Sequence, residues 1–351
     1  MPGGRLEILR AIPDDPQPLL AEPEIRQRSC SNLNTHCEAD TTRRLAPWRG
    51  YLRGPPPERC MRFPLEHQEI PTNGIRLHVV QTGPVTGPLV LLLHGFPEFW
   101  YGWRYQLPSL AAIGYRVWAP DQRGYNLSDR PPGITAYRLE VLAADVLGLL
   151  DATGQEKASI VGHDWGGVVG WWLASHAPHR LERMVVINAP HGAVMRQHLR
   201  RRPEQWLKSA YIGFFQLPWI PELVSRMGHW RLLVRALQQS SRPGTFTTAD
   251  LEHYRQAWAH PQGYHAMLNW YRAAVRKPPS FPVHRPITVP TLLIWGALDV
   301  FLSREMAHSS IALCQGGQLA MLEEGTHWVH HEEAARVNAL IDTFLRGGQA
   351  S

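Results

Sequence analysis

The chain has 351 residues, of which 44% are hydrophobic and 19% charged, and a formal net charge of +6. This composition excludes a disordered chain, and the length allows two ordinary domains or one large domain with an insertion. No apolar run reaches the ~18 residues that a transmembrane helix needs. The run Arg200–Arg202 could in principle meet phosphates, but basic residues are otherwise interleaved with acidic ones, and there is no nucleic-acid-binding motif. We therefore expect solvated helix faces and no nucleic-acid partner.

Residues 1–60 differ in composition from the rest of the chain. They are rich in proline, include the turn-rich segment Gly54–Pro57, and show no sustained periodicity. We expect a poorly ordered N-terminal extension, with Met61 as an alternative start. Because no signal-peptide layout is present, the expected location is cytoplasmic. The four cysteines fit neither a zinc pattern nor a disulfide framework, and no metal or cofactor is expected; they are Cys30, Cys37, Cys60 and Cys314.

Short apolar runs in the following part of the chain predict buried strands. The predicted strands are Ile75–Gln81, Leu89–Leu93, Arg116–Ala119, Ala158–Val161, Met184–Ile187, Thr291–Trp295 and the weaker Gln318–Leu322. Helical stretches separate them, such as Tyr137–Ala152, which ends before Gly154. This alternation predicts an α/β fold with an open, mostly parallel sheet.

The alternation stops after Ile187 and resumes near Pro290. The intervening stretch has helical composition interrupted by prolines, with helices expected within Met195–Phe215 and Ala249–Arg276. We expect residues 191–285 to form a helical cap, inserted between the two parts of the core, 61–190 and 286–351. Such a cap would cover the carboxyl ends of the strands, where sheets of this kind bind ligands.

The segment Val161–Gly167 (VGHDWGG) follows a predicted strand and opens an apolar helix. This is the context of a nucleophile elbow, G-x-Nuc-x-G, with Asp164 where lipases and esterases have serine. Bulky side chains at Gly162 or Gly166 would clash with the neighbouring strand and helix. A capping Asp in a glycine-rich turn is the alternative interpretation.

Three further elements at strand ends favour the catalytic interpretation. His94-Gly95-Phe96-Pro97 ends one strand, and the backbone N–H groups of Phe96 and Trp165 are the expected oxyanion hole. Asp299 follows a later strand, and His327 follows the last one. The order nucleophile, acid, base is the order in which such a triad occurs along the chain.

An aspartate nucleophile attacks an sp3 carbon and forms an alkyl ester, which a water activated by histidine then hydrolyses. Epoxide opening and halide displacement both fit this chemistry. An epoxide oxygen needs a proton donor, and the cap offers Tyr211 and Tyr271, with Tyr254 and Tyr264 as further candidates.

At these motifs the sequence resembles epoxide hydrolases of the α/β-hydrolase superfamily, over residues 65–348. The motifs that match are His94–Glu98 with Trp103-Arg104, Asp121–Tyr125, Gly162–Gly166, Phe215–Trp219, Asn269–Arg272, Trp295–Asp299 and Gly325–Trp328. The resemblance implies a mostly parallel eight-stranded sheet with a helical cap. It also implies Asp164 as nucleophile, Asp299 and His327 as its partners, and Tyr211 and Tyr271 as donors to the epoxide oxygen.

The substrate implied is a small apolar epoxide, hydrolysed with water to a diol; a homodimer is left open. The residues expected to line its site are His94, Pro97, Trp165, Phe215 and Trp270, and the cap aromatics Trp206, Phe214 and Trp219 suggest the same apolar character.

Two other hypotheses remain. The first is a haloalkane or haloacid dehalogenase with the same Asp nucleophile. Haloalkane dehalogenases typically have Asn where Phe96 stands, and fluoroacetate dehalogenases usually have Arg where Trp165 stands. Asn126, at a position where epoxide hydrolases often have a small residue, is a further departure. The second hypothesis is a non-catalytic binding protein with this fold.

Overall fold

The computed structural model describes residues 63–282 and 285–349. The expected N-terminal extension, the alternative start at Met61, and Cys30, Cys37 and Cys60 lie outside the described residues. Cys314 lies within them and has a free thiol. No helix in the described ranges is long and apolar enough to cross a membrane.

Eight strands of the described chain form one sheet, in the order β1-β2-β4-β3-β5-β6-β7-β8. The strands are β1 (Glu66–Thr72), β2 (Ile75–Thr82), β3 (Leu89–Leu93), β4 (Arg116–Pro120), β5 (Ala158–His163), β6 (Leu181–Ile187), β7 (Thr291–Gly296) and β8 (Gln318–Leu322). β2 is antiparallel to both of its neighbours, and every other pair is parallel. The predicted mostly parallel α/β sheet is confirmed.

All seven predicted strands are present, and β3 and β8 have the predicted bounds. β1 was not predicted from the sequence. It is an edge strand whose residues are mostly exposed and polar, so it lacks the apolar run by which buried strands are recognised.

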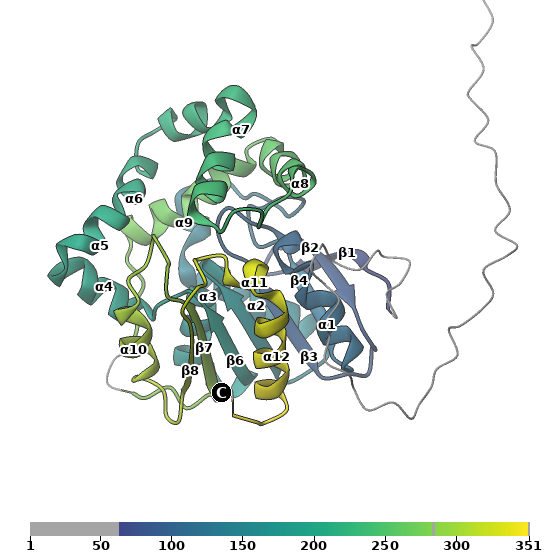
Figure 1. Cartoon of the computed structure of the whole chain (residues 1–351). Helices are drawn as coiled ribbons and strands as arrows, with labels where there is room; N and C mark the ends of the chain where they lie inside the picture. Colours follow the sequence, from purple (N-terminus) through teal and green to yellow (C-terminus); the bar gives the residue numbers. More distant parts are fainter. Residues whose placement is uncertain (1–62, 283–284, 350–351) are drawn as a thin grey trace, which may run out of the picture. The chain divides into compact units, whose positions relative to one another are not determined.

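Helices cover both faces of the sheet (Figure 1). The helices of the core are α1 (Gln106–Ala112), α2 (Leu139–Ala152), α3 (Trp165–His176), α10 (Glu305–Ile311), α11 (Val329–Glu332) and α12 (Ala334–Leu345). Side chains of β3 alternate between the two faces, because successive residues of a strand point in opposite directions. Val90 and Leu92 belong to the apolar cluster that includes α1 and α12, whereas Leu91 and Leu93 belong to the cluster that includes α2 and α3.

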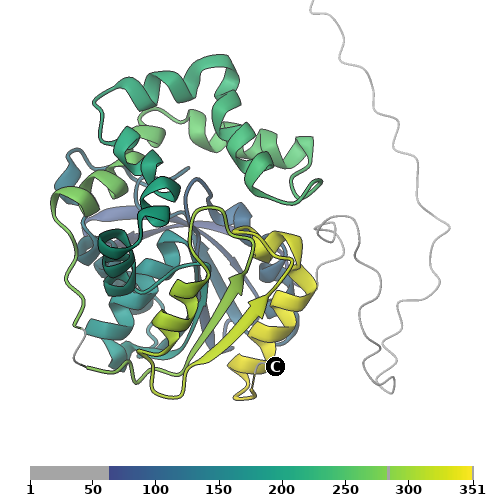
Figure 2. The same cartoon turned by 60° about the vertical axis from the view of Figure 1, so that its left-hand side comes forward.

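A helical insertion separates β6 from β7, as predicted (Figures 1 and 2). It comprises α4 (Gly192–Arg201), α5 (Pro203–Lys208), α6 (Ala210–Phe215), α7 (Ile220–Ser240), α8 (Thr248–Ala259) and α9 (Gly263–Arg276). We call these helices the cap. The stretch Met195–Phe215 divides into three short helices, and Ala249–Arg276 into two. The sequence did not predict α7, because Pro221 suggested a helix breaker. In the structure Pro221 occupies the first turn of α7, where proline is tolerated.

Candidate active site

Asp164 lies on the turn between β5 and α3, with a φ of 49°. Its backbone N–H donates to the carbonyl of Ile187 at 3.1 Å, and Val168 N–H donates to its carbonyl at 3.0 Å. A Cβ at Gly162 would meet the backbone of Gly166, and one at Gly166 would meet the carbonyl of Leu93. The glycines therefore allow the close strand–helix approach that exposes Asp164, as expected for a nucleophile elbow.

The carboxylate of Asp164 faces the loop that follows β3. The backbone N–H of Phe96 donates to Oδ1 of Asp164 at 2.9 Å. Any side chain at Gly95 would collide with that of Asp164. The loop thus brings a backbone donor against the carboxylate of the predicted nucleophile, the position expected for an oxyanion-hole donor. Trp165, the other predicted donor, is the first residue of α3.

His327 lies between two carboxylates. Its Nδ1 is 2.7 Å from Oδ2 of Asp299, and its Nε2 is 3.8 Å from Oδ2 of Asp164. The side chains of His327 and Asp299 are almost fully buried, whereas that of Asp164 remains 19% exposed. In this arrangement Asp299 orients the histidine ring, and the second ring nitrogen faces Asp164. Such a histidine is placed to act as a base toward an ester formed on Asp164.

Charge coupling shifts the pKa values of this pair in opposite directions. Burial lowers the pKa of His327, but Asp299 and, to a smaller extent, Asp164 outweigh it and raise that pKa to about 9. Burial raises the pKa of Asp299, but the charge and hydrogen bond of His327 outweigh it and lower the value. Before reaction, His327 therefore holds a proton and Asp299 is ionised at neutral pH.

Two cap tyrosines lie against the aromatic residues that surround Asp164. The ring of Tyr271 is 5.2 Å from that of Phe96 and 5.1 Å from that of Trp165. The ring of Tyr211 is 5.9 Å from that of Tyr271. Burial, and then the charge of Asp164, raise the pKa of Tyr211, so its hydroxyl stays protonated. The pKa of Tyr271 is raised well above its ordinary value by burial first, and then by Tyr211 and Asp164.

The other two candidate tyrosines have hydroxyl partners elsewhere. Tyr254 donates to Oε1 of Glu98 at 2.7 Å, and the hydroxyl of Ser225 donates to that of Tyr264 at 2.9 Å. Of the four candidates, Tyr211 and Tyr271 are therefore the two whose pKa values are raised by the charge of Asp164.

A family model described as the alpha/beta hydrolase fold matches residues 88–334. The chain belongs to the α/β-hydrolase family. It is 48% identical over 283 residues to the AB hydrolase superfamily protein YfhM of Bacillus subtilis (strain 168), covering 80% of this chain and 97% of that protein. It is 40% identical over 283 residues to human epoxide hydrolase 4, covering 79% of this chain and 77% of that protein.

Solved structures give the same relationship. A Bacillus megaterium epoxide hydrolase in complex with an inhibitor superposes with a TM-score of 0.73 at 29% identity, covering 80% of this chain and all of that one. Epoxide hydrolase A from Mycobacterium thermoresistibile superposes with a TM-score of 0.70 at 30% identity, covering 82% of this chain and 100% of that one. This α/β-hydrolase is thus closely related to epoxide hydrolases.

The residues expected to line the substrate site have different environments in this α/β-hydrolase. Phe215 packs its ring 5.5 Å from Phe96, beside the tyrosines. His94 is fully buried, and its ring nitrogens donate to the carbonyl of Gly95 and accept from Gln122 N–H. The buried Trp270 donates its indole N–H to the carbonyl of Arg123. His94 and Trp270 therefore hold the loops on which Phe96 and Arg123 lie.

Pro97 and two cap tryptophans also have distinct environments. The carbonyl of Pro97 accepts from the indole N–H of Trp258 at 2.6 Å, which ties the loop after β3 to the cap. Trp206 and Trp219 are 66% and 76% exposed. Both indole side chains are thus largely exposed to solvent, unlike the buried Phe215 and Trp270.

Asn188 is a residue of the site that was not predicted from the sequence. It follows β6, its side-chain amide donates to Oδ2 of Asp299 at 2.7 Å, and its Oδ1 accepts from Gly296 N–H at 2.9 Å. The N–H groups of Phe301 and Leu302 donate to Oδ1 of Asp299. Asp299 is therefore fixed by three donors besides His327. The available signal was a polar residue directly after a buried strand.

A second missed feature is the buried carboxylate of Glu98. Its Oε1 accepts from Tyr254 and from His331 Nε2, while its Oε2 lies 3.1 Å from Nδ1 of His163 and 3.3 Å from Nε2 of His330. His163 Nε2 then donates to the carbonyl of His327 at 2.9 Å. Burial raises the pKa of Glu98, but the histidines outweigh it and hold the value well below the ordinary one. The network connects a cap residue, Tyr254, to the backbone of the loop that carries His327.

Glu98, His163 and His330 are also the residues that could hold a metal. One ligand atom from each lies within 4.8 Å of the others, and a His2Glu set is chemically suited to Zn²⁺. However, each oxygen of Glu98 already has two protein partners. We therefore interpret the cluster as a hydrogen-bonded and ionic network that supports His327.

Asn126 also has a structural explanation. Its φ of 42° is left-handed, a conformation that asparagine tolerates, and its amide donates to Oδ2 of Asp121 at 2.7 Å. Asp121 Oδ1 in turn accepts from Trp100 N–H. The residue that departs from the family pattern thus stabilises the loop after β4.

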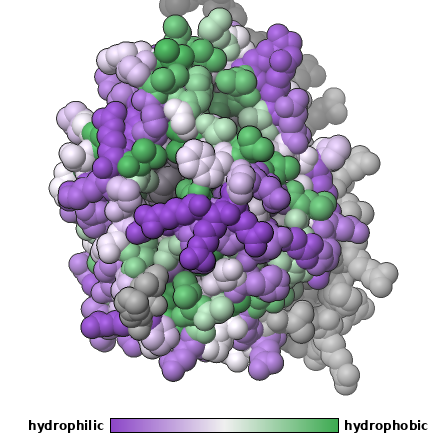
Figure 3. Space-filling model, turned by 90° about the vertical axis from the view of Figure 1, so that its left-hand side faces the viewer, coloured by the Kyte–Doolittle hydropathy of each residue, from purple (hydrophilic) through white to green (hydrophobic). Residues whose placement is uncertain are grey.

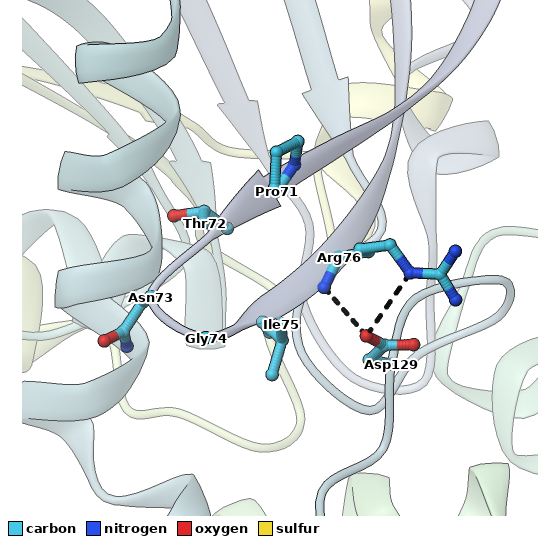
Figure 4. Close-up of a pocket in the computed structure, with 7 residues that line it drawn as sticks. All are labelled: Pro71, Thr72, Asn73, Gly74, Ile75, Arg76 and Asp129. Carbon is cyan, nitrogen blue, oxygen red and sulfur yellow. Dashed lines mark hydrogen bonds and ion pairs between the residues drawn. The ribbon is translucent and has the colours of Figure 1, made fainter.

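A surface hollow of about 550 Å³ lies at the turn between β1 and β2 (Figure 4). Its charged residues, Arg76 and Asp129, are paired with each other: Arg76 N–H donates to Oδ2 of Asp129 at 2.8 Å. Its lining includes none of the residues around Asp164. Size alone therefore does not make it the reaction site, since it offers no nucleophile with a base.

Proposed function

We propose that this α/β-hydrolase converts an apolar epoxide to a vicinal diol through an alkyl ester on Asp164. Asp164, His327 and Asp299 supply nucleophile, base and orienting acid. Phe96 and Trp165 supply backbone N–H groups to the oxyanion, and Tyr211 and Tyr271 donate to the epoxide oxygen.

In the first step a carboxylate oxygen of Asp164 attacks one epoxide carbon. The C–O bond of the ring breaks, and its electron pair stays on oxygen as an alkoxide, which takes a proton from a tyrosine hydroxyl. The protonated state of both hydroxyls, maintained by burial and by the charge of Asp164, suits this role.

In the second step the ester is hydrolysed. Ester formation removes the negative charge of Asp164, whose carboxylate oxygen lies 3.8 Å from Nε2 of His327, and so removes one cause of the raised pKa of that histidine. His327 can then pass its proton to the tyrosine and act as a base toward water. The water oxygen attacks the ester carbonyl carbon while His327 takes one water proton, and Phe96 N–H stabilises the oxyanion. Collapse breaks the ester C–O bond, and the leaving diol oxygen takes the proton from His327. The carboxyl group of Asp164 then gives its remaining proton to His327, which restores the starting state.

The observation that carries the proposal is the pairing of Tyr211 with Tyr271 beside Phe96 and Trp165. A departing halide needs no proton, because it leaves as a stable anion. An opening epoxide requires one, and two protonated hydroxyls at this position meet that requirement. The relatives named as epoxide hydrolases support the same choice.

The test is a single turnover in ¹⁸O-labelled water with enzyme in excess over an aryl epoxide such as styrene oxide. The mechanism places solvent oxygen in the carboxylate of Asp164, which mass spectrometry of the peptide detects. The diol oxygen then comes from the unlabelled enzyme carboxylate.

Three results would contradict the proposal. Diol that carries solvent oxygen while Asp164 stays unlabelled would exclude the ester intermediate. Halide release from bromoalkanes without epoxide turnover would favour the dehalogenase hypothesis. Tight binding of epoxides without any turnover would favour a binding protein.

A further inference from the structure

The first half of α7 exposes an apolar stripe to solvent. Ile220, Leu223, Val224 and Met227 lie at the i, i+3, i+4 and i+7 spacing by which a helix normally packs on a core. All four are exposed, Leu223 by 67% and Met227 by 63%. The stripe therefore lies on the outer side of the helix.

The opposite side of α7 makes polar contacts to the rest of the cap. The Ser225 hydroxyl donates to that of Tyr264, and Glu222 accepts from Arg272 at 2.8 Å and pairs with His265 at 2.7 Å. These contacts fix the rotation of the helix. The outward direction of the stripe is thus set by the fold, because turning it inward would break all three contacts.

Further apolar side chains are exposed on neighbouring parts of the cap. They are Trp206 and Leu207 on α5, and Leu217 and Trp219 before α7. Leu207 is 81% exposed. Figure 3 looks onto the side where α4, α5 and α6 lie in Figure 1, and hydrophobic residues gather over its upper part. We call the stripe and these four residues the apolar patch. Exposed groups of this kind mark interaction surfaces.

The helices that carry the patch are strongly basic. Residues 192–240 contain eight Lys or Arg and two Glu, a surplus equal to the formal net charge of the whole chain. The basic residues are Arg196, Arg200, Arg201, Arg202, Lys208, Arg226, Arg231 and Arg235. In Figure 3 a band of hydrophilic residues crosses the face below the hydrophobic ones. The surface thus combines exposed aliphatic and indole groups with positive charge.

A hollow of about 320 Å³ lies at the bend in α7, next to Met227 in the sequence. Arg226, Gly228, His229, Trp230 and Ala259 line it. Gly228, His229 and Trp230 all have left-handed backbone angles, which produce the bend. A basic hollow beside an apolar stripe is suited to an anionic head group whose acyl chains contact the stripe.

We propose that the cap binds the surface of an anionic lipid bilayer through the apolar patch, with the arginines of residues 192–240 facing the head groups. Tryptophan and aliphatic side chains enter the interfacial layer, and each nearby basic residue adds attraction to an anionic surface. Charge favours this partner over a second copy of the chain. A two-fold interface through the patch would place two basic surfaces against each other. The binding is peripheral and independent of the chemistry at Asp164.

The test is co-sedimentation of the full chain with two kinds of large unilamellar vesicle. One kind is phosphatidylcholine alone, and the other contains equal parts of phosphatidylcholine and phosphatidylglycerol. We expect binding to the anionic vesicles, with weakening at high salt. Each basic residue near an anionic surface raises the affinity severalfold. The affinity for neutral vesicles should therefore be lower than that for anionic vesicles by about tenfold or more.

Two variants separate the apolar and charged contributions. Leu223→Gln with Met227→Gln should weaken binding about tenfold, whereas Val85→Gln with Val275→Gln, at apolar positions that are also exposed, should not. Arg200→Gln with Arg201→Gln should weaken binding and reduce its salt dependence, whereas Arg336→Gln on α12 with Arg346→Gln, directly after that helix, should not. Circular dichroism and thermal unfolding check that each variant is folded.

Three outcomes would overturn the proposal. The first is no binding to anionic vesicles, and the second is equal loss in the patch and control variants. The third is a dimer, detected by light scattering, that Leu223→Gln with Met227→Gln dissociates. That outcome would make the patch an interface between copies of the chain.

Discussion

Asp299 and His327, which are separated by 28 residues, meet at 2.7 Å through Oδ2 and Nδ1. The contact leaves Nε2 of His327 directed toward Asp164, so that one ring senses the charge of both carboxylates. In the mechanism that we propose, Asp164 loses its charge when it is alkylated, so the basicity of His327 depends on the stage of the reaction.

Replacing His327 should separate ring opening from ester hydrolysis. In His327→Gln, Asp164 can still attack the epoxide, but water has no base, and general-base catalysis typically contributes about 10²–10⁴-fold. We expect one equivalent of substrate to be consumed rapidly, with the protein gaining the mass of one epoxide. Intact mass spectrometry after manual mixing measures this. A variant that stays unmodified while the wild-type enzyme turns over would show that His327 is also needed for the first step.

Asn188→Ala should lower kcat about tenfold or more, with a smaller effect on KM, because Asp299 loses a donor and can rotate away from His327. Asn338→Ala is the matched control. Asn338 is also bonded through its side chain, to Gln106 and Tyr105, but on α12 and away from Asp164. Steady-state kinetics of both variants test the role of Asn188. Equal losses of kcat would indicate a general effect of removing a structural amide.

The stability of the protein should decrease as His327 loses its proton. The folded pKa of about 9 exceeds the ordinary value of 6.5, so the native state binds this proton more tightly than the unfolded state does. The stabilisation is therefore complete below pH 6.5 and is lost as the pH rises through about 9. The shift corresponds to about 3 kcal/mol in the free energy of unfolding.

Urea unfolding at several pH values between these limits measures the loss. His327→Gln should show a flatter profile, whereas His308→Gln, at an exposed position, should follow the wild-type protein. Parallel profiles for all three proteins would show that another group causes the pH dependence.

The fold was predictable wherever local pattern determines structure. Leu89–Leu93 is apolar at every position because helices cover both of its faces, and its bounds match those predicted. β1 and α7 were missed for opposite reasons. β1 lies at the sheet edge and needs few apolar residues. The first half of α7 has its apolar residues on the solvent side, and a proline lies in its first turn.

The site was predictable where function imposes a motif on a strand end. Asp164 could be predicted as the nucleophile because an exposed nucleophile on a tight turn requires glycines around it. Asn188 could not, because its role depends on β6 lying beside β7, although Asn188 and Asp299 are 111 residues apart. Glu98 was missed for a similar reason, since its four partners come from β5, α8 and α11, and only the folded chain brings them together.

The cap tyrosines give the most direct distinction between epoxide and halide chemistry. Tyr211→Phe or Tyr271→Phe alone should slow alkylation of Asp164 by about 10-fold to 100-fold, because the remaining hydroxyl still donates. The double variant should lose about 10³-fold or more, since the alkoxide then has no proton donor. Stopped-flow quenching of tryptophan fluorescence, or rapid quench followed by mass spectrometry, measures this step.

Tyr264→Phe is the control for this prediction. Tyr264 lies on α9, as Tyr271 does, and is equally buried, but its hydroxyl accepts from Ser225. The variant should therefore alkylate at the wild-type rate. If the double variant opens epoxides as fast as this control, proton donation by the tyrosines is excluded. Bromoalkanes would make the distinction sharper, because halide displacement needs no proton and should not depend on these hydroxyls.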